Sequence, residues 1–217
     1  ISHVIRGEDH ISNTPKQMLI YKALGWTMPK FGHLPMILGS DGKRLSKRHG
    51  AKGTSEYKDL GYLPDTLINY LALLGWNPGN DDEIFDFNYL QENFSLGKVN
   101  KKSAVFDTTK LEWVSSQNIF KIPAAKLVDI ASEFDPTWCG EGHNLDYLIN
   151  VIDLIKDRIK TLSDIKENAY YFFNHPTKYD EAAMKKCWGE NSNSILNSFQ
   201  EELSQLDDWN SSNIDEL

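Results

Sequence analysis

A run of basic residues, Lys43-Arg44-Leu45-Ser46-Lys47-Arg48, follows an apolar segment and a glycine-containing turn early in the sequence. Its cationic side chains repel one another unless a polyanion lies among them. Placed after a strand and a turn, such a run indicates a mobile loop that closes over phosphate groups. The same run could instead be a solvated face or a nonspecific anion patch, and charge alone does not separate these readings.

The order of residues within the run favours phosphate chemistry. Basic-Leu-Ser-Lys-Arg after an apolar strand resembles the lysine-rich signature loop of class I aminoacyl-tRNA synthetases. Further segments resemble glutamyl-tRNA synthetases in the same order along the chain. These are residues 4–10 (VIRGEDH) with 12–17 (SNTPKQ), residues 63–76 (LPDTLINYLALLGW), and residues 104–107 (AVFD) leading to 110–113 (KLEW). The similarity is strong over residues 3–120 and weaker beyond.

This resemblance implies an ATP site. Class I synthetases join an amino acid carboxylate to the α-phosphate of ATP and release pyrophosphate, so groups that bind the charge of the transition state lower the barrier. Lys47 would be the principal phosphate contact, and Lys47 and Arg44 the catalytic residues. Arg44 stands where the family often has lysine, which keeps the charge and changes the donor geometry. The implied ATP-binding set is Lys47, Arg44, Leu45, Ser46, Arg48, Met36 and Ile37. The backbone of the last two would hold the adenine, although their side chains could equally be core residues.

The resemblance also implies an amino acid site. Arg6 leaves a strand end, where open α/β sheets place their ligands, and arginine grips a carboxylate with two parallel donors. In the resembled family Arg6 would bind the side-chain carboxylate of glutamate, and His10 could line the same pocket. The alternatives are an ion pair of Arg6 with Glu8 or Asp9 and a purely structural role for His10.

Two other clusters could contact RNA. Lys98, Lys101 and Lys102, with Asn118, could touch tRNA phosphates, although an exposed helix end would look the same. The aromatic run from Tyr170 to Phe173 could stack unpaired anticodon bases, although the spacing favours core positions.

The activity implied is that of a glutamate–tRNA ligase, which forms glutamyl-adenylate and transfers glutamate to the 3′ end of tRNA(Glu). The expected cofactors are ATP and Mg²⁺. The expected partners are tRNA(Glu), glutamate and ATP, with no membrane or DNA, in a cytoplasmic protein that is a monomer by family default. The alternatives are a glutaminyl-tRNA synthetase, a glutamyl-queuosine tRNA synthetase relative, or a noncatalytic tRNA-binding module.

One motif of the resembled family has no counterpart here. Class I synthetases carry an earlier His-x-Gly-His pattern that holds ATP from the opposite side, and this sequence of 217 residues has none. We therefore expect an internal or C-terminal fragment that lacks the first half of the catalytic domain and is inactive by itself.

Charge and cysteine content are consistent with this interpretation. The net charge is −8, but residues 1–60 hold 10 Lys and Arg against 5 Asp and Glu, whereas residues 124–217 hold 8 against 18. Positive charge thus gathers around the signature run, where phosphates need it.

Cys139 and Cys187 lie outside any Cys-x-x-Cys or paired-histidine spacing, so zinc is unsupported and reduced thiols are expected. No apolar run approaches the roughly 18–20 residues that span a bilayer.

The elements that position these residues begin with strand, helix and strand. We predict a buried strand over residues 1–5, a helix from Thr14 to about Leu24 capped by Asn13, and an apolar strand over residues 34–38. This order is consistent with part of a parallel α/β sheet. Downstream, Leu63, Leu67, Leu71 and Leu74 recur at helical spacing, helices follow near residues 88–94 and 107–116, and amphipathic patterns continue beyond residue 123.

The predicted fold class is mainly α with a small α/β remnant. It comprises the tail of a class I Rossmann-type catalytic domain, a stem-contact helical region and an anticodon-binding helical bundle. The predicted boundaries are 1–50 for the catalytic part with the signature loop, 51–122 for the stem-contact region and 123–217 for the bundle, which we expect to be incomplete.

Overall fold

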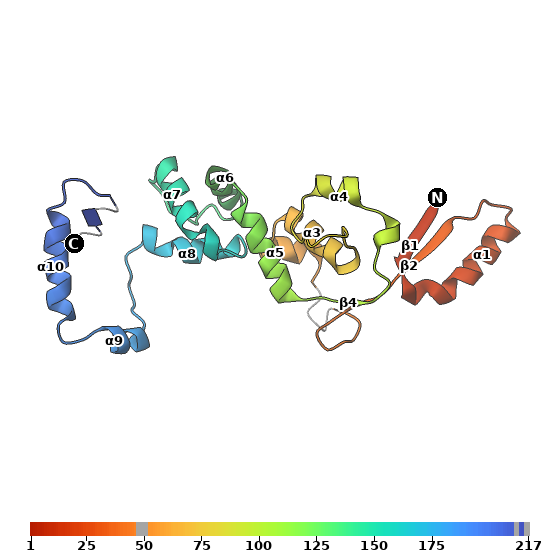
Figure 1. Ribbon diagram of the computed structural model, residues 1–217, viewed down its shortest axis with the longest axis horizontal. Helices are drawn as coiled ribbons and strands as arrows, with labels where there is room; N and C mark the ends of the chain where they lie inside the picture. The colour runs from red at the N-terminus through yellow and green to blue at the C-terminus, as the bar shows by residue number, and fades with distance from the viewer. Residues whose placement is uncertain (47–51, 211–212, 215–217) are drawn as a thin grey trace. The chain divides into compact units, whose positions relative to one another are not determined.

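The computed structural model describes residues 1–46, 52–210 and 213–214 of the chain (Figure 1). The strands are β1 (His3–Gly7), β2 (Lys30–Leu34), β3 (Ile37–Leu38) and β4 (Ala104–Val105). The α-helices are α1 (Thr14–Ala23), α2 (Thr54–Asp59), α3 (Pro64–Gly75), α4 (Phe87–Asn93), α5 (Thr108–Phe120), α6 (Ala124–Phe134), α7 (Leu145–Ile155), α8 (Ser163–Phe173), α9 (Glu181–Cys187) and α10 (Ser192–Ser204). Short 3-10 turns are η1 (Glu8–Asn13), η3 (Leu96–Lys98) and η4 (Lys156–Arg158). The prediction of a mainly helical chain with a small strand component is confirmed.

The first strand pair is a β–α–β unit. β1 and β2 are parallel, with His3 opposite Lys30 and Gly7 opposite Leu34, and η1 and α1 connect them. The predicted buried strand over residues 1–5 is wrong in two respects. The strand begins at His3, and its Ile5 remains 46% exposed because it faces an open cavity rather than a packed layer.

The cap predicted at Asn13 is also absent. Asn13 has φ −86° and ψ −21° and makes no side-chain hydrogen bond to the start of α1. An N-cap side chain reaches the helix when its own backbone is extended, and Asn13 is instead helical because η1 runs directly into α1. The first-turn proline of α1 is present as predicted.

The strand predicted over residues 34–38 is divided by Pro35. β2 ends at Leu34, and β3 begins only at Ile37 and pairs in parallel with β4, far along the chain. Proline has no backbone N–H to donate to a ladder, so the break falls where the sequence places it. The apolar segment therefore changes partners, and this joins the first strand pair to the helical region that follows.

α3 and α5 build the first core of that helical region. α3 begins at Pro64 and ends at Gly75, as the leucine spacing predicts. Tyr70 and Leu74 of α3 pack with Leu111 and Val114 of α5. The Tyr70 hydroxyl donates to the Asp107 carbonyl at 2.8 Å and accepts from the Asp107 N–H at 2.7 Å. Burial raises the pKa of Tyr70 to about 12, so the hydroxyl stays neutral.

A smaller cluster of Trp76, Phe85 and Leu90 lies around α4.

The larger second core belongs to the predicted bundle and draws on the end of α5 and on α6, α7 and α8. Its buried members are Ile119, Leu127, Val128, Ala131, Trp138, Val151, Ile152, Ile155, Ile159, Leu162, Ile165 and Ala169. α6 starts directly after Pro123, but Ile119 and Leu63 from before that point also pack into this core. The boundary at residue 122 therefore stays a prediction.

Residues 174–217 form a second compact unit, which contains α9 and α10. The Asp180 side chain caps α9 by accepting from the Ala183 N–H. α10 follows the predicted amphipathic spacing, and its apolar Ile195 and Leu196 are exposed. Among the described residues, no helix combines the length and apolar character needed to cross a membrane.

Candidate functional site

The basic run begins as the return arm of a tight hairpin. The Gly39 N–H donates to the Lys43 carbonyl at 2.8 Å, and the Leu45 N–H donates to the Ile37 carbonyl at 2.9 Å. Gly42, with φ +71°, supplies the left-handed conformation that this turn requires. The hairpin places Arg44 and Leu45 directly beside β3.

A cleft of about 510 Å³ lies between this hairpin and the end of β1. Its lining residues are Arg6, Gly7, Asp9, His10, Leu34, Pro35, Met36, Ile37, Arg44 and Leu45. The cleft thus brings together most of the residues predicted for ATP and glutamate, although they lie at opposite ends of the first 45 residues. Ser46 is half-buried at the end of the hairpin and is not among the lining residues. Lys47 and Arg48 lie outside the described residues.

Arg6 is held at the wall of the cleft by contacts from two other elements. Its Nη2 donates to the Thr14 Oγ1 at 2.9 Å, and that oxygen also lies 2.9 Å from His33 Nε2. Its guanidinium carbon lies 5.6 Å from the centre of the Phe31 ring. The Arg6 Nε is buried and has no hydrogen-bond partner in the described part of the chain. A buried donor without a partner is costly unless a ligand accepts from it.

The carboxylates next to Arg6 are used elsewhere. An Asp9 oxygen lies 3.2 Å from Arg44 Nη2, and the other lies 4.0 Å from His10 Nε2. Glu8 accepts a hydrogen bond from the Met36 N–H at 3.2 Å. Within residues 1–46 and the other described ranges, Arg6 therefore forms no ion pair with either acid.

Three residues organise this site in roles that the sequence pattern does not predict. Thr14 and His33 orient Arg6, and Asp9 ties the basic run to the end of β1. The sequence pattern predicts Glu8 and Asp9 only as possible partners of the nearby Arg6. The excess of positive charge in the basic run that begins at Lys43 is the signal in the sequence that could have indicated an ion pair between Asp9 and Arg44.

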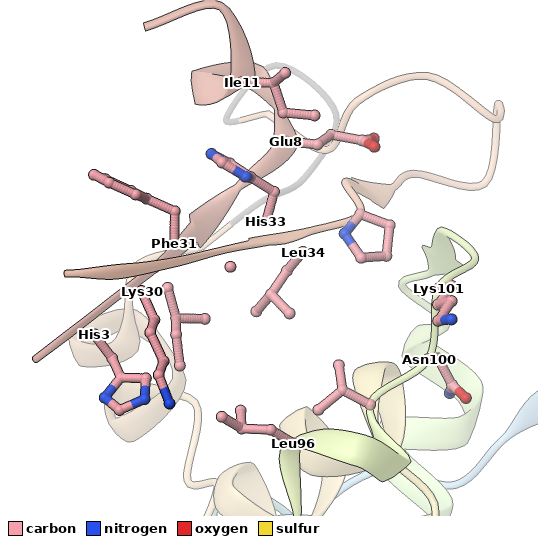
Figure 2. Close-up of a pocket in the computed structure, with 14 residues that line it drawn as sticks. His3, Glu8, Ile11, Lys30, Phe31, His33, Leu34, Leu96, Asn100 and Lys101 are labelled. Atoms are coloured by element: carbon pink, nitrogen blue, oxygen red, sulfur yellow. The ribbon is translucent and has the colours of Figure 1, made fainter. Parts of the chain in front are cut away.

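A second cavity of about 480 Å³ shares Leu34 and Pro35 with the first cleft as lining residues, and Figure 2 shows it. His3 and Lys30 lie close together on one wall, and Leu96, Asn100 and Lys101 face them from the segment around η3 (Figure 2). Among the described residues, none of those predicted for ATP or glutamate lines this cavity. We place the candidate site in the first cleft because the chemically distinctive side chains converge there.

The predicted RNA contacts are only partly brought together. Lys101 and Lys102 are exposed, whereas the Lys98 ammonium donates to the Pro78 carbonyl at 2.6 Å and the Asn118 side-chain nitrogen is buried. Within the aromatic run, Tyr170 and Tyr171 are exposed, and Phe172 and Phe173 pack against the bundle core. The run is thus divided between surface and core.

Two family models match the chain. Residues 1–113 match tRNA synthetases class I (E and Q), catalytic domain, and residues 125–217 match an anticodon binding domain. The first match covers slightly more than half of the chain and includes the whole cleft.

Curated relatives and solved structures agree with these matches. The glutamate–tRNA ligase of Moorella thermoacetica is 40% identical over 97% of this chain and 44% of its own length. That of Elusimicrobium minutum is 44% identical over 88% of this chain and 39% of its own length. A solved structure is also similar: the crystal structure of a glutamate tRNA ligase from Elizabethkingia meningosepticum in complex with its amino acid. Its TM-score to this chain is 0.85 and its sequence identity is 31%. The match covers 95% of this chain and 45% of the ligase chain. The chain spans less than half the length of these relatives.

Proposed function

Because the chain belongs to the class I tRNA synthetases of the glutamate and glutamine group, we propose that its protein is a glutamate–tRNA ligase. It activates glutamate with ATP to form glutamyl-adenylate and then transfers the glutamyl group to the 3′ end of tRNA(Glu). The names of the relatives support this assignment. The observation that carries it is the cleft, where a buried arginine donor without a partner lies near a second arginine and a wall of apolar residues that includes Met36 and Ile37.

In this proposal, Arg6 recognises the side-chain carboxylate of glutamate. Its free Nε and the remaining Nη protons present parallel donors to a carboxylate, and Thr14 and Phe31 keep the guanidinium plane in place. A charged guanidinium binds a carboxylate better than an amide, which favours glutamate over glutamine. His10 lines the same wall.

ATP occupies the other half of the cleft. The backbone at Met36 and Ile37 faces the adenine, and Leu45 anchors the loop. Arg44, Lys47 and Arg48 neutralise the phosphates as pyrophosphate leaves, and the Ser46 hydroxyl can donate a hydrogen bond to them. Asp9 sets the starting position of Arg44. We propose that Mg²⁺ enters with the nucleotide, held by phosphate oxygens that suit a hard cation. No group of three or more metal-ligating side chains is gathered within the described residues.

The test uses the complete gene product that carries residues 1–217, with glutamate, ATP and tRNA. Arg6→Ala should raise the KM for glutamate roughly tenfold to a hundredfold, because a charge-assisted hydrogen bond contributes about 1.5–3 kcal/mol. Lys47→Ala should lower kcat roughly a hundredfold or more, as does the loss of one preorganised donor to a transition state. Arg158→Ala, at an exposed position in η4, is the matched control and should change neither constant.

Three outcomes would contradict the proposal. Charging of glutamine in preference to glutamate by the wild-type protein would favour the glutaminyl alternative. Glutamylation of a modified base of tRNA rather than of the 3′ end would favour the queuosine-type relative. Binding of tRNA without any formation of aminoacyl-adenylate would identify a noncatalytic module.

A further inference from the structure

Gly61 lies in the turn between α2 and α3, where the chain passes against the beginning of α8. It is buried and has φ +81°. A Cβ atom at this position would lie 2.7 Å from the Ser163 backbone nitrogen and 2.9 Å from that of Leu162. Both neighbours are backbone atoms, which cannot turn aside as a flexible side chain can. Only glycine fits here without displacing one segment from the other.

The surface that Gly61 touches is itself firmly held. The Leu162 N–H donates to the Gly61 carbonyl at 2.9 Å, and the Leu162 side chain belongs to the core of the bundle. The Asp164 carboxylate accepts from the backbone N–H groups of Lys160 and Thr161, at 2.9 and 2.8 Å. The start of α8 is therefore fixed on the bundle side of the contact.

Other links join the same parts of the molecule, and one of them is Leu63, which packs against the bundle core. α5 contributes Leu111 and Val114 to the α3–α5 core and Ile119 to the bundle core. The Lys160 ammonium lies 2.8 Å from the Glu112 carboxylate, which crosses from α5 to the segment before α8. Within this junction, Gly61 determines how closely the α2–α3 turn approaches the start of α8 and so contributes to the angle between them.

We propose that Gly61 is a positioning residue that sets this angle, and that charging of tRNA depends on it. The inference rests on the proposed function. tRNA must reach the cleft with one end while it contacts the bundle, the part matched by the anticodon-binding family. Glutamate contacts only the cleft. A wedge at Gly61 rotates the bundle against the α3–α5 segment, and a displacement of about 1 Å remote from the chemistry can cost roughly a hundredfold in rate.

The primary test is Gly61→Ala in the complete gene product. The KM for tRNA should rise at least tenfold, whereas the dissociation constant of glutamate, measured by calorimetry, should stay within twofold of wild type. Gly75→Ala is the matched control, because no atom lies within 4 Å of a Cβ built at Gly75 and its φ is not positive. The control should leave both constants unchanged.

A second test does not depend on the folding of the glycine variant. Glu112→Lys and Lys160→Glu each place like charges across the same junction, at positions partly exposed to solvent. Each single variant should raise the KM for tRNA about threefold or more, and the double variant should restore it toward wild type. A direct contact of Lys160 with tRNA phosphate would give no such restoration.

The outcomes separate this inference from the proposed function. If the wild-type protein does not charge tRNA with glutamate, the proposed function fails. If it does, and folded Gly61→Ala retains the wild-type KM for tRNA, the positioning role is wrong. If Gly61→Ala does not fold, the charge-swap pair decides: restoration in the double variant supports the role, and additive losses overturn it.

Discussion

The segment that carries the candidate site and the helical region that follows it are stabilised in different ways. In the described residues 1–46, no large apolar side chain is buried, and β1, β2 and the hairpin are held by backbone pairing and a few polar contacts. In residues 54–173, apolar side chains form three buried clusters. Side chains that bind a ligand must stay accessible, so their segment cannot be stabilised by burying them.

The largest expected difference concerns matched isoleucines. Ile152→Ala in the bundle core should lower the free energy of unfolding by about 2–5 kcal/mol, because it removes buried methyl groups and leaves a cavity. Ile5→Ala, at a half-exposed position in β1, should lower it by less than about 1 kcal/mol. Urea unfolding followed by circular dichroism measures both. Equal losses would remove the distinction between the regions.

Amide hydrogen exchange should sharpen the same contrast. Amides of β1 and β2 should exchange through local openings that require roughly 2 kcal/mol less than those of α7, because few buried contacts hold the strand pair. The exchange rates are measured at a series of urea concentrations below the unfolding transition. The rates of the α7 amides should rise with urea, whereas those of the β1 amides should not. Uniform protection across both would contradict the expectation.

Helix capping differs between the regions as well. The Asp107 carboxylate accepts from the Thr109 and Lys110 N–H groups at the start of α5, whereas Asn13 makes no such bond at the start of α1. Asp107→Ala should therefore destabilise the chain by about 1 kcal/mol, and Asn13→Ala should have little effect. Asp107→Asn is the control, because asparagine caps nearly as well. Thermal unfolding of the three variants gives the comparison.

The smallest expected effect is a pH-dependent one in the helical region. Hydrogen bonds from the Thr137 hydroxyl and N–H, with a further contribution from Lys166, lower the pKa of Asp135 from 3.8 to about 2. A lowered pKa stabilises the folded state above the unfolded value, and this contribution disappears as the pH falls from about 4 toward 2. Asp135→Asn should cost at most about 1 kcal/mol at pH 7, since the carboxylate is a third exposed and solvent screens it.

The matching measurement compares Asp135→Asn with wild type in urea at pH 7 and at pH 3. The difference between the two proteins should be smaller at pH 3. A difference that stays constant between the two pH values would mean that the Asp135 charge does not contribute.

Local sequence signals predicted the elements that depend on neighbouring residues. The leucine spacing and Pro64 predicted α3, Asp107 predicted the start of α5, and the amphipathic patterns predicted the bundle helices. Local sequence signals were insufficient where contacts with a segment distant in the chain determine the structure. The strand over residues 34–38 is interrupted at Pro35, and the pairing of its second half with β4, some 65 residues later, could not be read from the local pattern.

The candidate site shows the same division. The resemblance of the sequence motifs to class I synthetases selected Arg6, His10, Met36, Ile37, Arg44 and Leu45, and the chemistry of carboxylate and phosphate recognition independently supports Arg6 and Arg44. The partners of these residues, Thr14 with Arg6 and Asp9 with Arg44, became clear only from the fold. Gly61 is the clearest case: nothing in its sequence context points to Ser163. Local propensity and chemistry are properties of neighbouring residues and can be read along the chain, whereas distant contacts depend on how close two backbones come in space, and the tertiary structure alone decides that distance.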